Sequence, residues 1–169
     1  QIACAQWKHF AAQLERSDVD AAAHTHTFVQ DLLRDVFGYA NLQPCTGITL
    51  GERHYPVSLL AGSVPVVVAP HTLALHEPDP RFAIAGSGSR KKSAFMLAQE
   101  LLNASSDHLW GVVCNGKTLR LLRDAATLTR PSFLEIDLAD LLGGQRYAEF
   151  ANVWRLLHAS RFAGSPTEC

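Results

Sequence analysis

The chain has 169 residues, a length that fits one domain, and 47% of them are hydrophobic, which supports a sizeable core. Its formal net charge is −1, so there is no overall basic character, and a nucleic-acid-binding role would have to rest on a local patch. No run of about 18 apolar residues occurs, so we expect no membrane-spanning helix and no membrane partner.

The four cysteines lie far apart, without the CxxC spacing of a zinc site or a redox motif. Scattered cysteines are typical of a reducing compartment, and the first ten residues do not resemble a signal peptide. We therefore expect a cytoplasmic location. The chain starts without Met and ends in the turn-like AGSPTEC, so we interpret it as a single domain cut from a longer protein.

Two helices are expected at the start of the chain. Apolar residues recur at helical spacing over residues 2–15, and again in THTFVQDLLRDVFGY, residues 25–39. Gly38 can end the second helix, because glycine readily adopts the left-handed conformation found there.

A strand-rich section follows. GITLGERHY (47–55) and PVSLLAG (56–62) are expected to pair as a hairpin. VPVVVAP (64–70) is wholly apolar and bounded by Pro, which is typical of a central strand buried on both faces. The long segment after it is rich in Pro, Gly and Ser, and residues 76–92 are expected to form a flexible loop.

RKKSAFMLAQELLNAS (90–105) predicts a helix whose first residues are cations, the unfavourable charge for a helix start. HLWGVVCNGKTLRLLRD (108–124) predicts two strands joined by an Asn-Gly pair, which favours a type I′ turn. SFLEIDL (132–138) predicts a strand and YAEFANVWRLLHASRF (147–162) a closing helix. The expected fold is α/β (α+β), a mixed sheet flanked by helices.

Six cations are the candidate DNA-binding residues. Three follow a flexible GSGS loop at a helix start, a place where phosphate can bind, although solvated loop charges are the alternative interpretation. Three lie on or beside the second strand of the predicted hairpin, where a solvated strand edge is the alternative to phosphate contact. The six are Arg90, Lys91, Lys92, Lys117, Arg120 and Arg123.

No catalytic residue is predicted, because the sequence has neither a GxSxG nucleophile elbow nor a GxGxxG dinucleotide motif. His71, His76, Glu77 and Asp79 occur together in the long loop, and such side chains can hold a divalent ion. Their spacing matches no known metal site, so we expect no metal either.

The second half of the chain resembles a known family. Residues 97–162 are similar to the region ahead of the methyltransferase core in type IIG-like adenine-specific DNA methyltransferases of bacterial restriction–modification and phage-defence systems such as DISARM. The resemblance rests on Gln99, Leu102 and Asn103, on the LWGVVCNGKTLRLLRD hairpin, and on the segments LEIDL and HASRF. It is looser over residues 25–96.

The resemblance implies a role in DNA methylation or phage defence, with DNA and S-adenosylmethionine as ligands of the parent protein. The Asn-Pro-Pro-Tyr motif and the glycine-rich methyl-donor loop of the family do not occur in this sequence. We therefore expect no cofactor and no methylation from this segment alone. Its expected partners are the DNA backbone and the methyltransferase domain.

The N-terminal region of such proteins is similar to the PD-(D/E)xK nuclease fold, in which carboxylates bind Mg²⁺ and a Lys orients the attacking water. If VPVVVAPH is the third strand, the first acid falls near Pro56 or Val57. The Glu-x-Lys positions then fall on Ala69, Pro70 and His71. None of these residues is a carboxylate, so the resemblance implies a restriction-endonuclease-like scaffold without activity.

Two alternatives stay open. An active Mg²⁺-dependent DNA endonuclease would need displaced acids, for which Glu52, Asp79 and Glu100 are the candidates. A purely structural module would pack on the methyltransferase domain and never contact DNA.

Overall fold

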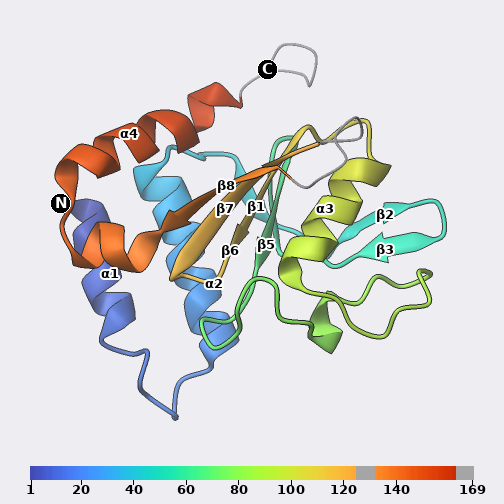
Figure 1. Cartoon of the computed structure of the whole chain (residues 1–169), viewed down its shortest axis with the longest axis horizontal. Helices are drawn as coiled ribbons and strands as arrows, with labels where there is room; N and C mark the ends of the chain where they lie inside the picture. Colours follow the sequence, from blue (N-terminus) through green and yellow to red (C-terminus); the bar gives the residue numbers. More distant parts are fainter. Residues whose placement is uncertain (125–131, 163–169) are drawn as a thin grey trace.

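Helices lie on both faces of a mixed sheet in the computed structural model, which describes residues 1–124 and 132–162 (Figure 1). This confirms the predicted fold class. The α-helices in these residues are α1 (Ile2–Ala11), α2 (Ala21–Asp31), α3 (Ala94–Ala104) and α4 (Tyr147–Leu157). Shorter helical turns are the π-helical η1 (Leu32–Val36) and η3 (Ala139–Gly143) and the 3-10 turns η2 (Pro80–Phe82) and η4 (Ala159–Arg161).

The main sheet has the strand order β1-β4-β5-β6-β7-β8 in the described residues. Strands β5 and β6 run parallel, and the other neighbours run antiparallel. Strands β2 and β3 form a separate antiparallel pair. The bounds are β1 (Leu42–Pro44), β2 (Ile48–Leu50), β3 (Arg53–Tyr55), β4 (Leu59–Ala61), β5 (Val64–Val68), β6 (Trp110–Cys114), β7 (Thr118–Arg123) and β8 (Phe133–Asp137).

Strand β5 is the central strand that its apolar sequence predicts. All five of its residues are buried, and it lies between β4 and β6. Val66 packs in the hydrophobic core on one face of the sheet, whereas Val67 packs in the core on the other face. A strand that is covered on both faces has no polar side, which explains the continuous apolar run.

The predicted hairpin between residues 47–55 and 56–62 is wrong. The first segment folds back on itself as β2 and β3, while the second segment supplies β4, which pairs with β1 and β5. Gly51 and Gly62 have φ values of +59° each and allow tight turns after Leu50 and Ala61. The tight turns at these two glycines therefore join β2 to β3 and β4 to β5, whereas β3 and β4 belong to different sheets.

The two faces of the main sheet are covered by different helices. Helices α1, α2 and α4 lie on one side, and α3 lies on the other, next to the β2–β3 pair (Figure 1). The first layer contains the aromatic residues Trp7, Phe10 and Phe28, and the second is built around Leu97 and Leu101 of α3. No helix within the described residues has the length and apolar character needed to cross a membrane.

Helix α2 begins earlier than its apolar pattern predicts. Asp20 caps it at Ala21, because its carboxylate accepts hydrogen bonds from the backbone N–H groups of Ala22 and Ala23. The helix continues into η1 and stops before Gly38, whose φ of +77° confirms its predicted role at the helix end.

Helix α3 begins at Ala94, so the predicted start at residue 90 is wrong. The hydroxyl of Ser93 accepts a hydrogen bond from the N–H of Met96 and caps the helix. The preceding cations therefore lie outside the first turn, which removes the conflict with the helix dipole. In the preceding segment, isolated bridges join Asp79 to Lys92 and His54 to Ala85. The flexibility of residues 76–92 stays a prediction.

Strands β6 and β7 confirm the predicted hairpin, but the type I′ turn is wrong. A type I′ turn needs positive φ at both central residues. Here Gly116 has a φ of +81°, and Asn115 is not among the described residues with positive φ. The side-chain oxygen of Asn115 instead accepts hydrogen bonds from the N–H groups of Lys117 and Thr118. The Asn side chain therefore stabilises the turn from outside the central pair.

Candidate nucleic-acid interface

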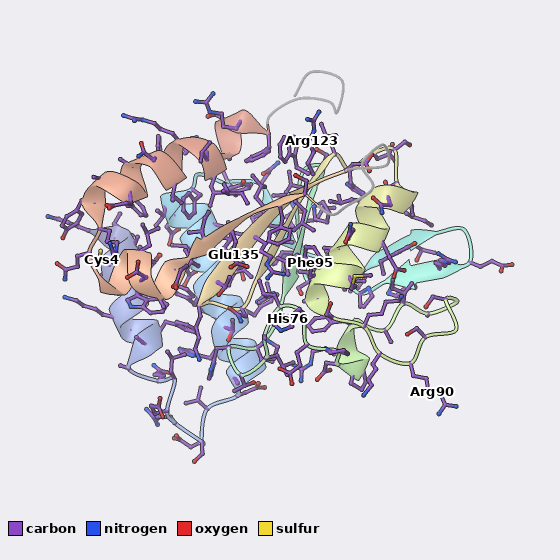
Figure 2. The ribbon with its side chains drawn as sticks, in the orientation of Figure 1. Cys4, His76, Arg90, Phe95, Arg123 and Glu135 are labelled. Atoms are coloured by element: carbon purple, nitrogen blue, oxygen red, sulfur yellow. The ribbon has the colours of Figure 1, made fainter. Side chains whose placement is uncertain are left out.

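The six predicted DNA-binding cations do not form one continuous row. Arg90, Lys91 and Lys92 precede α3, whereas Lys117, Arg120 and Arg123 belong to the β6–β7 hairpin. Figure 2 shows Arg90 at the lower right of the molecule, extending away from the body, and Arg123 near the top. Contact of a nucleic-acid backbone with the first group therefore does not imply contact with the second.

In the first group, Arg90 and Lys91 have exposed side chains. Lys92 differs, because its ammonium forms an ion pair with Glu100 of α3 and only 17% of its side chain is exposed. A lysine held in this way would have to give up its partner before it could contact a phosphate. Arg90 and Lys91 are therefore the available charges of this group.

The loop that carries these two cations packs closely on the β2–β3 pair. A Cβ added to Gly86 would lie 2.3 Å from the backbone oxygen of Glu52, so a larger residue would force the two segments apart. Lys91 also acts on Asp79: the backbone N–H of Arg81 lowers the pKa of Asp79 most, and the positive charge of Lys91 contributes. Lys91 and Arg81 thus lie within electrostatic reach of the same carboxylate.

Arg120 is engaged inside the protein. Its Nε donates a hydrogen bond to Glu135 of β8 at 2.6 Å, and 14% of its side chain is exposed. Its guanidinium also lies 5.0 Å from the ring centre of Phe95 and 4.5 Å from that of Phe133. The predicted strand edge is wrong, because β7 lies between β6 and β8.

The other two hairpin cations are exposed but far from each other along β7. Arg123 ends the strand, with its guanidinium 5.5 Å from the ring centre of Trp110. Because residues three apart on a strand point to opposite faces, Arg123 and Arg120 do not share a surface. Lys117 lies in the turn at the other end of β7, near His71. Burial is the main cause that lowers the pKa of His71, and the positive charge of Lys117 lowers this pKa further.

The positions that the nuclease comparison assigns to metal-binding acids hold no carboxylate. Val57 precedes β4 and Ala69 follows β5, and both are buried in the core beside α3. His71 is buried against Phe10, and its backbone N–H donates a hydrogen bond to the hydroxyl of Thr25. These contacts are those of a packed strand end and not of an open catalytic site.

The three alternative acids are held in three different places. Glu52 is exposed in the β2–β3 turn, Asp79 accepts hydrogen bonds from Arg81, and Glu100 pairs with Lys92. Across residues 1–124 and 132–162, no group of three or more His, Cys, Asp or Glu side chains is arranged to hold a metal ion. The geometry therefore gives no support to the endonuclease alternative from these residues.

A shallow pocket of about 340 Å³, open to solvent, lies at the carboxyl end of β5, and no sequence motif pointed to it. We call it the β5 cavity; its polar lining comes from His26 of α2, Ser58 before β4 and Arg81 of η2. These residues are 55 positions apart in the sequence at most, and no motif links them. To identify these residues from sequence, one would need to know which strand ends pack against α2.

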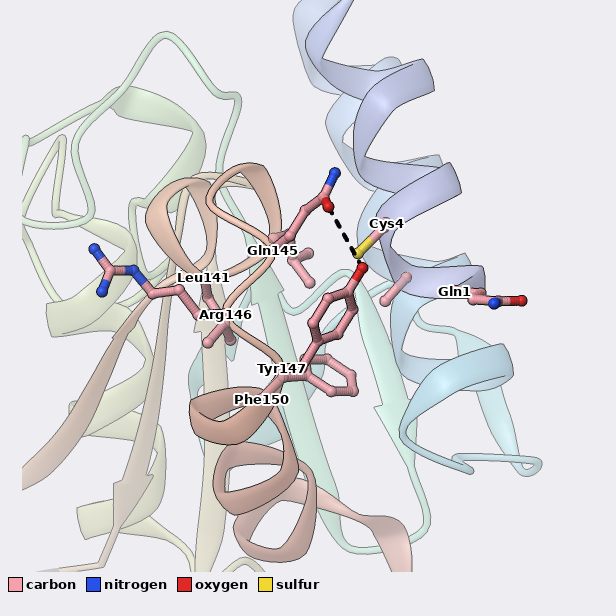
Figure 3. Close-up of a pocket in the computed structure, with 9 residues that line it drawn as sticks. Gln1, Cys4, Leu141, Gln145, Arg146, Tyr147 and Phe150 are labelled. Carbon is pink, nitrogen blue, oxygen red and sulfur yellow. Dashed lines mark hydrogen bonds between the residues drawn. The ribbon is translucent and has the colours of Figure 1, made fainter.

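A second cavity, between α1, η3 and α4, is too small for a substrate. Figure 3 shows Cys4, Gln145 and Tyr147 directed into the same space, and the Tyr147 hydroxyl donates a hydrogen bond to Gln145 Oε1 at 3.4 Å. Its volume is about 30 Å³, room for about one water molecule. This cavity is a packing defect at a helix junction.

Comparison of the chain with protein-family models, with curated proteins and with solved structures finds no match. The geometry of the cations and of the β5 cavity is therefore the basis for a functional proposal.

Proposed function

We propose that this chain is a non-catalytic domain of a bacterial restriction–modification or phage-defence DNA adenine methyltransferase. In this proposal it contacts the DNA backbone and packs on the methyltransferase domain, which would bind S-adenosylmethionine. The observation that carries the DNA contact is the pair of exposed cations, Arg90 and Lys91, of which Arg90 extends away from the body (Figure 2). Exposed cations without a protein partner can neutralise phosphates at little cost.

Two further features support this proposal. The chain has the expected order of a helix, antiparallel strands, the buried strand β5 and then helix α3 with Gln99. The strand ends at Val57 and Ala69 are packed with apolar residues, which favours binding over hydrolysis. Lys117 and Arg123 are exposed as well and are candidates for a second contact, whereas Lys92 and Arg120 are held by carboxylates.

Salt-dependent binding of a fluorescent duplex to the chain tests this function. Each phosphate contact that is lost should lower the slope of log affinity against log salt by about 0.9, because fewer counterions are released. The Arg90→Ala/Lys91→Ala variant should therefore show a slope lower by about 1.8. Fluorescence anisotropy over a series of NaCl concentrations measures both slopes.

Arg34→Ala is the matched control, because Arg34 is an exposed arginine whose charge is already paired with Asp31 and Asp35. Its slope should equal that of the unmodified chain. An equal slope for the double variant would remove the phosphate role of Arg90 and Lys91. An absence of binding even at low salt would favour the purely structural module instead.

A further inference from the structure

The β5 cavity has a lining that suits an anion. Its charged and polar side chains are Arg81, His26 and Ser58, and none of the residues that line it is an Asp or Glu. The lining itself therefore offers no carboxylate to a cation, and the neighbouring carboxylate of Asp79 is already paired with Arg81. The apolar part of the lining, which includes Val68 and Phe82, forms the wall next to the core.

Arg81 can provide the main contact. Its Nε donates a hydrogen bond to Asp79 at 2.9 Å, which fixes the direction of the guanidinium. Within residues 1–124 and 132–162 the terminal guanidinium nitrogens have no protein partner, and they remain as donors for a ligand. A planar guanidinium with two free nitrogens matches two oxygens of a phosphate.

Ser58 and His26 add donors on the other sides of the cavity. The Ser58 hydroxyl oxygen accepts a hydrogen bond from the backbone N–H of Val68 at 3.3 Å. Because that bond uses a lone pair, the hydroxyl hydrogen is left for a ligand. His26 is half-buried on α2 and can donate from its ring. The backbone N–H groups of Ala22 and Ala23 at the start of α2 are not available to a ligand, because they already donate to the Asp20 carboxylate.

We propose that the β5 cavity binds one phosphate group of a nucleic-acid backbone through Arg81, His26 and Ser58, without a metal ion. The inference rests on the proposed function and extends its contact surface beyond the loop cations. A nucleic-acid backbone is the expected source of the phosphate because Lys91 lies next to Lys92, whose backbone pairs with that of Asp79, the partner of Arg81. A backbone that occupies the cavity can therefore place a neighbouring phosphate beside Lys91.

NMR titration of the chain with inorganic phosphate at constant ionic strength tests the cavity separately from DNA binding. Saturable shifts are expected at the ring of His26 and at the backbone amides of Ser58 and Arg81. Arg81→Gln should weaken phosphate binding about tenfold, because the Gln amide can replace one of the two donor groups but supplies no charge. Arg16→Gln is the matched control, because Arg16 is an exposed arginine paired with an Asp two residues away.

His26→Ala provides a second variant in case Arg81→Gln disturbs the loop, because Ala is well tolerated in a helix. Equal phosphate binding in Arg81→Gln, His26→Ala and Arg16→Gln, or no shift at the cavity, would overturn the inference even if duplex binding through Arg90 and Lys91 stands. Phosphate shifts without any duplex binding would instead sink the proposed function and the nucleic-acid source of the phosphate.

Discussion

Arg120 packs against a pair of aromatic rings and a carboxylate. The rings of Phe95 and Phe133 contact each other, with centres 5.1 Å apart, and both contact the guanidinium, while Glu135 accepts from its Nε. Glu135 is half exposed, so solvent screens the ion pair and the aromatic contacts contribute a comparable share of the stabilisation. An arginine in this position links α3, β7 and β8, and its role is therefore structural.

Arg120→Ala should lower the free energy of unfolding by about 1–3 kcal/mol, because it removes the aromatic contacts and the hydrogen bond together. It should leave the salt slope of DNA binding unchanged. Urea unfolding and the duplex titration measure the two quantities. Arg123→Ala is the comparison: its side chain is exposed and, among the described residues, stacks on Trp110, so we expect a loss of about 0.5 kcal/mol. A stable Arg120→Ala protein with a reduced salt slope would reverse this assignment.

At the scale of elements, the β6–β7 turn is fixed by the close approach of α1. Gly116 has a φ of +81°, and a Cβ placed there would lie 2.5 Å from Cζ of Phe10. Phe10 cannot move aside easily, because it is buried and stacked on Phe28 with ring centres 4.3 Å apart. The turn needs glycine for two reasons, its backbone conformation and the space that it leaves.

Gly116→Ala should therefore destabilise the chain more than Gly88→Ala. Gly88 also has a positive φ, +77°, but a Cβ there would have no neighbour within 4 Å. Strain alone predicts a loss of about 1–2 kcal/mol for Gly88→Ala, and the added clash predicts about 3 kcal/mol for Gly116→Ala. Equal losses in urea unfolding would show that Phe10 adapts to the extra methyl group.

The same elements show how far sequence patterns predict this fold. Helical periodicity located the helices, and a continuous apolar run located the buried strand β5, because burial imposes both patterns directly. It failed on the pairing of β2, β3 and β4, because short strands have too few residues to show which partner covers them. The start of α3 depends on one Ser93 hydroxyl, and three preceding cations obscured it.

The candidate site was harder to predict than the fold. A sequence shows how many cations a segment has, but not that Glu135 and Glu100 would occupy Arg120 and Lys92. These ion pairs join different elements, so only the assembled fold reveals them. The β5 cavity was missed for the same reason, since α2, the segment before β4, the end of β5 and η2 meet there without a shared motif.

At the scale of the whole molecule, one sheet connects two hydrophobic layers. Strands β5 and β6 place alternate residues in each layer, so Val66 and Val112 face α1, α2 and α4 while Val67 and Val113 face α3. Because both layers pack on the same strands, unfolding of one layer would expose apolar residues of the other to water. We therefore expect the described part of the chain to unfold as one cooperative unit.

Leu97→Ala tests this coupling, because Leu97 is fully buried in the α3 layer. The cavity should cost about 3 kcal/mol. The three tryptophans report on the opposite layer: Trp7 and Trp110 pack in or against it, and Trp154 donates a hydrogen bond to Val36 of η1. One cooperative unit requires that tryptophan fluorescence and far-ultraviolet circular dichroism shift to the same lower urea midpoint.

Met96→Ala is the matched control for this prediction, because Met96 is the preceding residue of α3 and 43% of it is exposed. Its change should stay within about 0.5 kcal/mol, as for most surface substitutions. If Leu97→Ala lowers the dichroism midpoint while the fluorescence midpoint stays in place, the α3 layer unfolds separately. In that case Arg90 and Lys91, which lie just before the Ser93 cap of α3, would lie on the less stable side of the molecule. DNA binding should then protect that layer from unfolding.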